Sequence, residues 1–165
     1  MTTLRDINLT TLKNGLRIVT DRMETVETVS VGVWVNAGAR DEELDINGIS
    51  HLLEHMAFKG TRKRDAFAIA AEVEAVGGHL NAYTSRENTA YYAKVLKENV
   101  TLAIEIIADI LQYSLMEKEE LERERAVILQ EILQTNDTPD DIVFDHSQAT
   151  AFPDQSMGRP ILGRS

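Results

Sequence analysis

The sequence contains no cysteine, and this absence limits how the chain can bind metal or cross-link itself. Disulfide frameworks and thiolate metal sites are excluded, so any metal ligand has to be a histidine or a carboxylate. Proline is also scarce, with three residues among 165, and aromatic residues make up only 5% of the chain. Apolar residues still account for 43%, which is enough for one globular domain with a buried core.

Basic residues are outnumbered, and long hydrophobic runs are missing. Seventeen lysines and arginines face 27 aspartates and glutamates, which gives a net charge of −10. A chain this acidic is not expected to bind nucleic acid, whereas its charge suits a cationic ligand. No membrane span is expected, because no apolar run is long enough. Residues 1–23 show neither a signal nor a transit peptide, so we expect a cytoplasmic protein of bacterial type, although a processed N-terminus would look the same.

The most informative segment is residues 51–55, with the sequence His-Leu-Leu-Glu-His. If this segment is helical, His51 and His55 lie on one face and can bind one Zn²⁺, with Glu54 beside the metal. This order of residues is the inverzincin motif. Apolar residues recur alongside it at the spacing of a packed helix: Ile49, Leu52, Leu53 and Met56. The alternative interpretation is a surface helix with two incidental histidines.

The remaining sequence combines strand and helix patterns. Asn14-Gly15 predicts a hairpin with a type I′ turn over residues 10–19, and alternating valines predict a strand over residues 29–35. Further strands are predicted over residues 80–85 and 89–96, and helices over residues 65–76, 100–111 and 116–135. Asp65 is the expected N-cap of the first of these helices, and Pro139 ends the last, before a short helix and a loop. We therefore expect an α+β fold, a mostly antiparallel sheet with helices packed on one side.

A catalytic zinc usually has three protein ligands, so a third residue is needed beside the two histidines. His79, His146 or a carboxylate are the candidates. Acidic residues crowd the helix predicted over residues 116–135, and most of them are expected to form a solvated face. Glu131 differs because its neighbours one turn away are apolar, where an unpaired carboxylate is costly. From its helical phase alone, Glu131 is equally well interpreted as a zinc ligand or as a partner in a salt bridge. Glu124, two turns earlier, is a weaker candidate, for a residue that supports a ligand.

These residues and several further segments together resemble the pitrilysin/insulinase family of zinc peptidases, and within it the processing peptidases. The similar segments extend over nearly the whole chain: residues 12–16, 38–42, 48–50, 58–61, 77–84 and 158–163. The resemblance implies the N-terminal half of an inverzincin peptidase, a zinc-dependent endopeptidase. It implies that His51, His55 and Glu131 bind zinc, that Glu54 is the catalytic base and that Glu124 has a supporting role near the site.

The resemblance also implies where a peptide substrate binds. Asn81, Ala82 and Tyr83 fall on the edge strand that, in relatives, pairs with an extended substrate. Asp141 and Asp145 match acidic positions that receive an arginine near the cleavage point in processing peptidases. The alternative interpretation of these two aspartates is solvation of a helix end.

Members of the family are usually much longer, with a second, similar half that closes over the site. We therefore expect residues 1–165 to be an N-terminal zinc-binding catalytic domain whose partners are a peptide substrate and either a C-terminal half or a second subunit. The isolated chain is expected to bind zinc but to be a weak or inactive peptidase. The alternatives are a non-catalytic subunit and a metal-binding interaction module, and peptide hydrolysis measured against zinc content would separate them.

Overall fold

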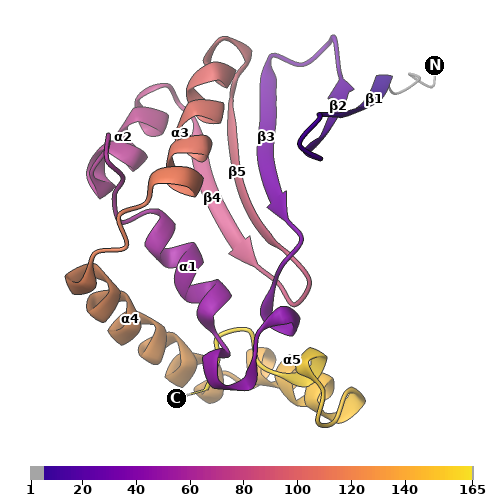
Figure 1. The fold of residues 1–165 in the computed structure, drawn as a ribbon, viewed down its shortest axis with the longest axis vertical. Coiled ribbons are helices and arrows are strands. Elements are labelled where there is room, and N and C mark those ends of the chain that lie inside the picture. Colours follow the sequence, from indigo (N-terminus) through magenta and orange to yellow (C-terminus); the bar gives the residue numbers. More distant parts are fainter. Residues whose placement is uncertain (1–5, 165) are drawn as a thin grey trace.

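Five strands form two separate antiparallel sheets in the computed structural model, which describes residues 6–164 (Figure 1). The ends of the predicted domain, residues 1–5 and 165, lie outside the described residues. One sheet pairs β1 (Asp6–Thr11) with β2 (Arg17–Arg22). The other has the strand order β3-β5-β4, with β3 (Thr28–Val35), β4 (His79–Thr84) and β5 (Thr89–Leu96). This order leaves β4 at an edge of its sheet.

The loop between β1 and β2 forms the predicted hairpin but not the predicted turn. Leu12 N donates to Leu16 O over 2.8 Å, and Gly15 N donates to Leu12 O over 2.9 Å. Gly15 has a φ of +88°, whereas Asn14 is not among the residues with positive φ. A type I′ turn requires positive φ at both central residues, so this prediction is wrong. The loop is longer, and only the glycine takes the left-handed conformation.

Within residues 6–164, five α-helices follow the predicted order; the three with predicted bounds begin and end within a few residues of them, and the helix after Pro139 is longer than expected, with 13 residues. The five helices are α1 (Ile49–Ala57), α2 (Ala66–Ala75), α3 (Val100–Tyr113), α4 (Lys118–Asp137) and α5 (Pro139–Ala151). Asp65 is the N-cap of α2, and its Oδ1 accepts from Ala68 N over 2.7 Å. Pro139 begins α5, where its fixed φ fits the first helical position and its missing N–H costs nothing. None of the helices within residues 6–164 has the length and apolar character needed to cross a bilayer.

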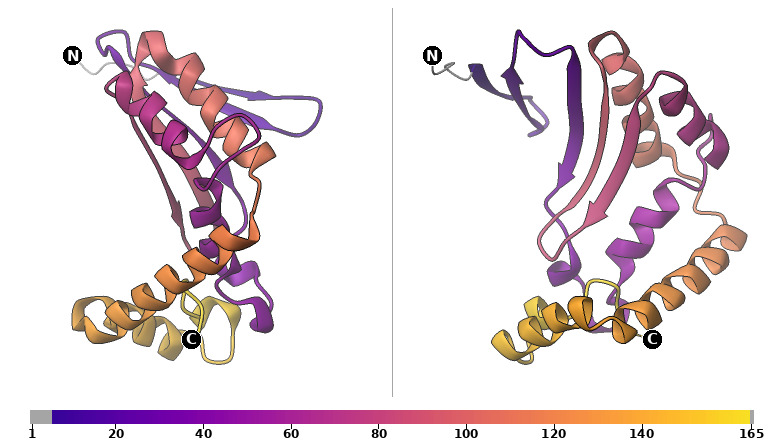
Figure 2. Two further views of the ribbon diagram at one scale, coloured as in Figure 1. Left: turned by 90° about the vertical axis from the view of Figure 1, so that its left-hand side faces the viewer. Right: turned by 180° about the vertical axis from the view of Figure 1, so that it is seen from behind.

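The hydrophobic core lies between one face of the three-stranded sheet and helices α2 and α3 (Figure 2). The buried residues of this core include Val73, Tyr91, Ala93, Val95, Ile106, Ile107 and Ile110. Trp34, on the opposite face of the sheet, is 61% exposed. Helices therefore cover one face of the sheet, and the predicted α+β class is confirmed.

Helices α1 and α4 lie side by side next to the β4 edge of the sheet, and α5 continues from α4 (Figures 1 and 2). Met56 of α1 and Ile128 and Ile132 of α4 are buried. This packing fixes α4 against α1, so that residues far apart in the sequence meet between the two helices.

Candidate metal centre and peptide cleft

The two histidines of the motif and one glutamate of α4 converge on a single point. His51 and His55 lie one turn apart on α1, with their ring centroids 4.5 Å apart. Glu131 Oε2 lies 3.7 Å from Nε2 of each histidine. Each of the three residues offers a ligand atom, and these atoms lie within 4.8 Å of one another. Among the described residues no other group of this kind is found, so neither His79 nor His146 belongs to such a cluster.

The donor atoms of this cluster fit zinc. Two imidazole nitrogens and a carboxylate oxygen are ligands that zinc takes when no cysteine is present, and three protein ligands leave one position open. Bond lengths of about 2.0–2.2 Å in a tetrahedral site place neighbouring ligand atoms about 3.3–3.6 Å apart. The separation of 3.7 Å between Glu131 and either histidine is close to that requirement. His51, His55 and Glu131 are therefore the residues that could hold the metal.

Glu124 contacts the metal cluster through His55. Its Oε2 lies 2.9 Å from His55 Nδ1, and its Oε1 lies 2.7 Å from Lys59 Nζ. Burial raises the pKa of Glu124, but the hydrogen bonds from Lys59 and His55 outweigh burial and hold the pKa below its usual value. The ionised carboxylate accepts a hydrogen bond from Nδ1–H of His55, so the proton stays on Nδ1 and the lone pair of Nε2 is free to face Glu131. This contact with His55 is consistent with the supporting role predicted for Glu124, which stays a prediction.

His51 is suited to bind metal as a neutral imidazole. Burial lowers its pKa, and the neighbouring His55 lowers it further, against the opposing effect of Glu131 and Glu42. A neutral ring does not have to lose a proton before it binds a cation. His51 Nδ1 is buried and has no hydrogen-bond partner among the described residues.

Glu54 lies beside the histidines with part of its carboxylate free. Its Oε2 is buried and has no hydrogen-bond partner among residues 6–164. Burial, and then the charge of Glu54, raise the pKa of the Tyr91 phenol to about 12, so this neighbour stays neutral. A buried carboxylate oxygen without a partner costs stability, and such a cost is typical of a functional group.

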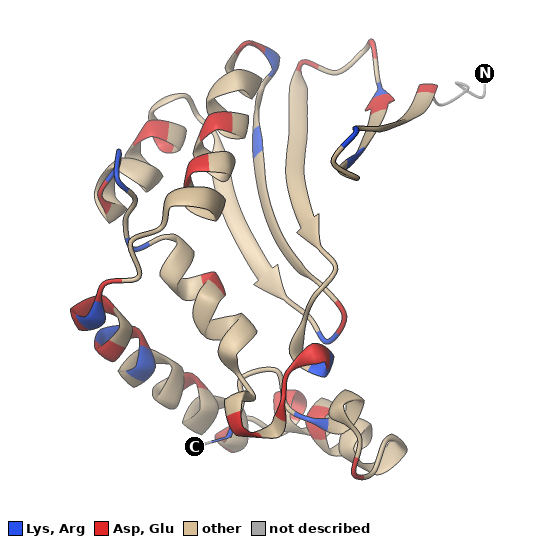
Figure 3. Ribbon diagram, in the orientation of Figure 1, with Lys and Arg blue, Asp and Glu red and all other residues tan. Residues whose placement is uncertain are grey.

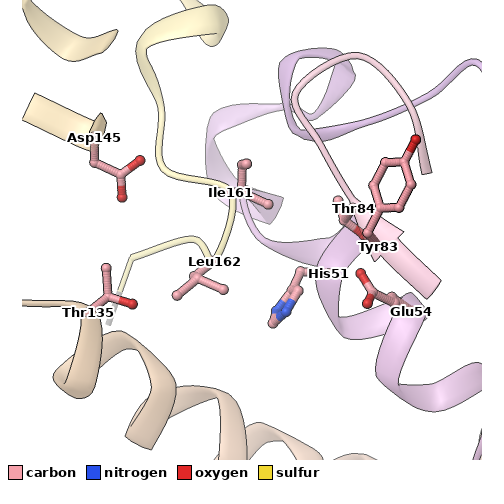
Figure 4. Close-up of a pocket in the computed structure, with 8 residues that line it drawn as sticks. All are labelled: His51, Glu54, Tyr83, Thr84, Thr135, Asp145, Ile161 and Leu162. Atoms are coloured by element: carbon pink, nitrogen blue, oxygen red, sulfur yellow. The ribbon is translucent and has the colours of Figure 1, made fainter. Parts of the chain in front are cut away.

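Glu54 and His51 both face a cavity of about 360 Å³. Figure 4 shows them on one side, Ile161 and Leu162 on a separate segment, and Asp145 farther away. Residues from five parts of the chain line this space: His51, Glu54, Tyr83, Thr84, Thr135, Asp145, Ile161 and Leu162. The sequence pattern did not predict the participation of Thr135, Ile161 or Leu162.

The strand β4 supplies the edge of the cavity. Asn81 and Tyr83 are exposed, whereas Ala82 packs against the hydrophobic core. The Ala82 N–H donates to Asn81 Oδ1 over 2.8 Å, so this backbone donor already has a hydrogen-bond partner within the same strand. Trp34 Nε1 donates to the Tyr83 hydroxyl over 3.2 Å across the sheet, a contact that the sequence did not reveal. The binding of substrate by these residues stays a prediction.

The two aspartates predicted to receive an arginine lie in different surroundings. Asp145 lines the cavity and already forms an ion pair with Arg86, at 2.9 Å between Nη2 and Oδ1. Arg86 Nε also donates to Met157 O over 3.1 Å. Asp141, one turn earlier on α5, is exposed and does not line the cavity. No pattern in the sequence predicted that Arg86, at the turn between β4 and β5, would contact α5.

The fold and the cluster define a class of protein: an α+β domain that carries the inverzincin motif on one helix, with a third candidate ligand, Glu131, on another. Over residues 17–165 the chain matches the family Insulinase (Peptidase family M16). It is 51% identical over 158 residues to the probable mitochondrial-processing peptidase subunit beta of Arabidopsis thaliana, covering 96% of this chain and 30% of the relative. It is 46% identical to an uncharacterized zinc protease of Streptomyces coelicolor, covering 95% of this chain and 34% of the relative.

A solved structure agrees with these sequence relatives. A protease from Helicobacter pylori matches with a TM-score of 0.91 and 29% identity, over 98% of this chain and 39% of that protein. The chain belongs to the insulinase family, peptidase family M16, so the predicted resemblance is confirmed. It spans about a third of the length of these relatives. One relative is named as mitochondrial, and the expected cytoplasmic location gains no support from it.

Proposed function

We propose that this chain provides the zinc-binding and water-activating part of an endopeptidase. The observation that carries this proposal is the convergence of His51, His55 and Glu131 beside the unpartnered carboxylate oxygen of Glu54. The cavity next to them is bounded by the edge strand β4. Membership of a peptidase family, and relatives named as zinc proteases, support the same function.

The proposed chemistry divides between the metal and the protein. His51, His55 and Glu131 would hold Zn²⁺, which when bound supplies Lewis acidity that lowers the pKa of water and polarises a carbonyl group. No donor within residues 6–164 competes for Glu54 Oε2, so this oxygen is free to accept a proton from the attacking water and to return it to the leaving amine. Glu124 keeps His55 in one tautomer and orientation.

An extended peptide is the proposed substrate. Because β4 has a neighbouring strand on one side only, a peptide can add to its free edge through main-chain hydrogen bonds. Asn81 has to release the Ala82 N–H before a substrate carbonyl can reach it. Acidic residues occur on α1, α4 and α5 (Figure 3), and the chain as a whole has a net charge of −10, which favours basic residues in the peptide. A basic side chain that reaches Asp145 has to share this carboxylate with Arg86.

The proposed partner is a second half or a second subunit that closes the cavity. Glu131 is 38% exposed in its side chain, so the cluster is accessible from solvent. The chain spans about a third of its relatives, and one of them is named as a subunit, which supports a larger assembly.

Zinc analysis of the wild-type chain and four variants tests the proposal. The wild-type chain and Glu54→Gln are expected to bind one zinc per chain, because Glu54 is not a ligand. His51→Gln, His55→Gln and Glu131→Gln each remove one donor atom and are expected to bind zinc at least about tenfold more weakly. Equal zinc affinity in all five proteins would show that the cluster is not the metal site.

Peptide hydrolysis then separates an enzyme from a metal-binding module. It is measured with the chain combined with the second half or subunit that we propose. We expect turnover with wild-type protein and none above background with Glu54→Gln at equal zinc content. Equal rates for the two proteins would remove Glu54 from the mechanism, and zinc binding without any hydrolysis would favour a non-catalytic subunit.

A further inference from the structure

The helix that carries the metal cluster cannot be capped by its own N-cap residue. This residue is Gly48, which has no side chain and a φ of +102°. A Cβ at this position would lie 2.8 Å from Leu162 O and 3.0 Å from the Cα of Gly163. Serine, threonine, aspartate and asparagine, the usual capping residues, are therefore excluded here by backbone conformation and by space.

A distant glutamate supplies the missing cap. Glu42 Oε2 accepts from Gly48 N over 2.7 Å, and Glu42 Oε1 accepts from Ser50 N over 2.8 Å. Its carboxylate is therefore bonded to two backbone N–H groups at the start of α1, groups that would otherwise lack a partner. Its negative charge also lies at the positive end of the helix dipole. Glu42 is only 7% exposed, so water does not readily replace it.

Two residues hold Glu42 in place, one bonded to its side chain and one to its backbone. Asn47 Nδ2 donates to Glu42 Oε2 over 2.9 Å and also to Pro160 O over 3.2 Å. Arg159 Nη1 donates to the backbone carbonyl of Glu42 over 2.6 Å. These bonds join the start of α1 to residues 158–163, the segment whose Ile161 and Leu162 line the cavity.

The two histidines depend on different supports. His51 is the third residue of α1 and lies in its first turn, where helices lose their hydrogen bonds most readily. Its Nδ1 has no partner among the described residues, so no other side chain orients the ring from that nitrogen. His55 lies one turn farther along the helix and is held by Glu124. The first turn, and with it His51, therefore depends on the cap.

We infer that Glu42 is a positioning residue for the metal centre: by capping α1 it holds His51 where His55 and Glu131 converge. This inference rests on the proposed zinc site. It also assigns a role to a buried carboxylate that takes no part in the proposed chemistry. Glu42→Gln keeps the size of the side chain but replaces one acceptor oxygen by an NH₂ group, which cannot accept from a backbone N–H.

Zinc affinity of the folded chain tests the inference. Dissociation constants are measured by chelator competition, at a temperature where circular dichroism shows every variant to be folded. Glu42→Gln is expected to bind zinc about 10–100-fold more weakly than wild type, the usual effect of removing a residue that orients a ligand. The matched control is Glu43→Gln, which makes the same change of charge at the exposed neighbour and should leave the affinity unchanged.

A double-mutant cycle separates positioning from a general loss of structure. If Glu42 acts through His51, Glu42→Gln has no further effect on zinc affinity when His51→Gln is already present. A loss of the same size in both backgrounds would overturn the inference, as would a Glu42→Gln affinity equal to that of Glu43→Gln. Failure of the wild-type chain to bind zinc would instead reject the proposed function, and the inference with it.

A milder variant covers the case in which Glu42→Gln does not fold. Asn47→Ala removes one donor to Glu42 Oε2 and the bond to Pro160, but it leaves both bonds from Glu42 to α1. It is expected to raise the zinc dissociation constant about threefold with an unchanged circular dichroism spectrum. An unchanged dissociation constant in this folded variant would overturn the inference.

Discussion

At the scale of single residues, two glutamates on nearly the same face of α4 have different surroundings. Glu131 is partly exposed, and its Oε2 lies 3.7 Å from Nε2 of both His51 and His55, where it could bind the same metal ion. Glu124, seven residues earlier, is 8% exposed in its side chain and is bonded to both Lys59 and His55. A buried carboxylate needs such partners, because an unpaired one is costly. Lys59 is therefore the residue that allows Glu124 to remain charged beside His55.

Replacing Lys59 tests this dependence. Lys59→Met keeps the apolar part of the side chain but leaves Glu124 Oε1 without its cationic partner. We expect the zinc-free protein to lose about 1–3 kcal/mol in its free energy of unfolding at pH 7, measured by urea denaturation. Lys63→Met is the control, because its ion pair with Glu105 is exposed and 3.7 Å long, and it should change stability by less than about 0.5 kcal/mol.

The same variant has a predicted dependence on pH. Folding holds the pKa of Glu124 below its ordinary value of 4.5. Its charge therefore contributes fully to stability above pH 4.5, and this contribution is lost as the pH falls through the folded-state pKa. The difference in stability between wild type and Lys59→Met should be largest near pH 7 and shrink on acidification below pH 4.5. A difference that grows on acidification would contradict this account of Glu124.

At the scale of secondary structure elements, the sequence predicted individual helices better than the contacts between them. The spacing of His51, Glu54 and His55 correctly indicated a helix, and helical phase correctly placed Glu131 near an apolar stripe. These features are local, because they repeat every turn of one helix. The role of Glu42 was not predicted, because its bonds to Gly48 N and Ser50 N depend on how the loop before α1 folds back, which no local spacing reveals. Only the glycine at the N-cap position could have suggested that the cap comes from elsewhere.

The packing of α4 against α1 carries a prediction about the metal ligand. Ile128 and Ile132 are 8% exposed and lie on either side of Glu131 in the helix. Ile132→Ala is expected to cost about 2–3 kcal/mol in the free energy of unfolding and to weaken zinc binding, because α4 loses its fixed position beside the histidines. Leu133, the next residue, is 54% exposed, so Leu133→Ala should have a small effect on both measurements. Equal effects of the two substitutions would show that α4 does not depend on this contact.

At the scale of the whole molecule, the proposed metal centre would link α1 to α4, two helices that are in contact but are separated in the sequence by α2, β4, β5 and α3. A ligand that binds only the folded state stabilises it by a free energy that grows with the logarithm of the free ligand concentration divided by the dissociation constant. At a free zinc concentration 100 times the dissociation constant, the gain is about 2.7 kcal/mol, or a rise of about 5–10 °C in melting temperature. Calorimetry with zinc and with EDTA measures this rise. An equal rise in Glu131→Gln would assign the stabilisation to another site.

The same scale shows why zinc binding and catalysis are expected to separate in this chain. The proposed ligands come from α1 and α4, which pack together within residues 6–164, so the proposed metal centre would need no further polypeptide. Catalysis also needs water to be excluded and the substrate to be held, because electrostatic stabilisation is weak in an open, hydrated site. The side chain of Glu131 is 38% exposed, and Tyr83 on the edge strand is 41% exposed. Nothing among the described residues covers this side.

We therefore expect the isolated 165-residue chain to bind one zinc but to hydrolyse peptides barely faster than its own Glu54→Gln variant. Both proteins are loaded with zinc and incubated with the same unstructured peptide that contains arginine, and the products are quantified by mass spectrometry. The variant sets the background, because contaminating proteases act equally in both samples. Strong hydrolysis by the wild-type chain that Glu54→Gln abolishes would contradict this prediction, since it would mean that the exposed half-site positions the substrate and excludes water without a second half.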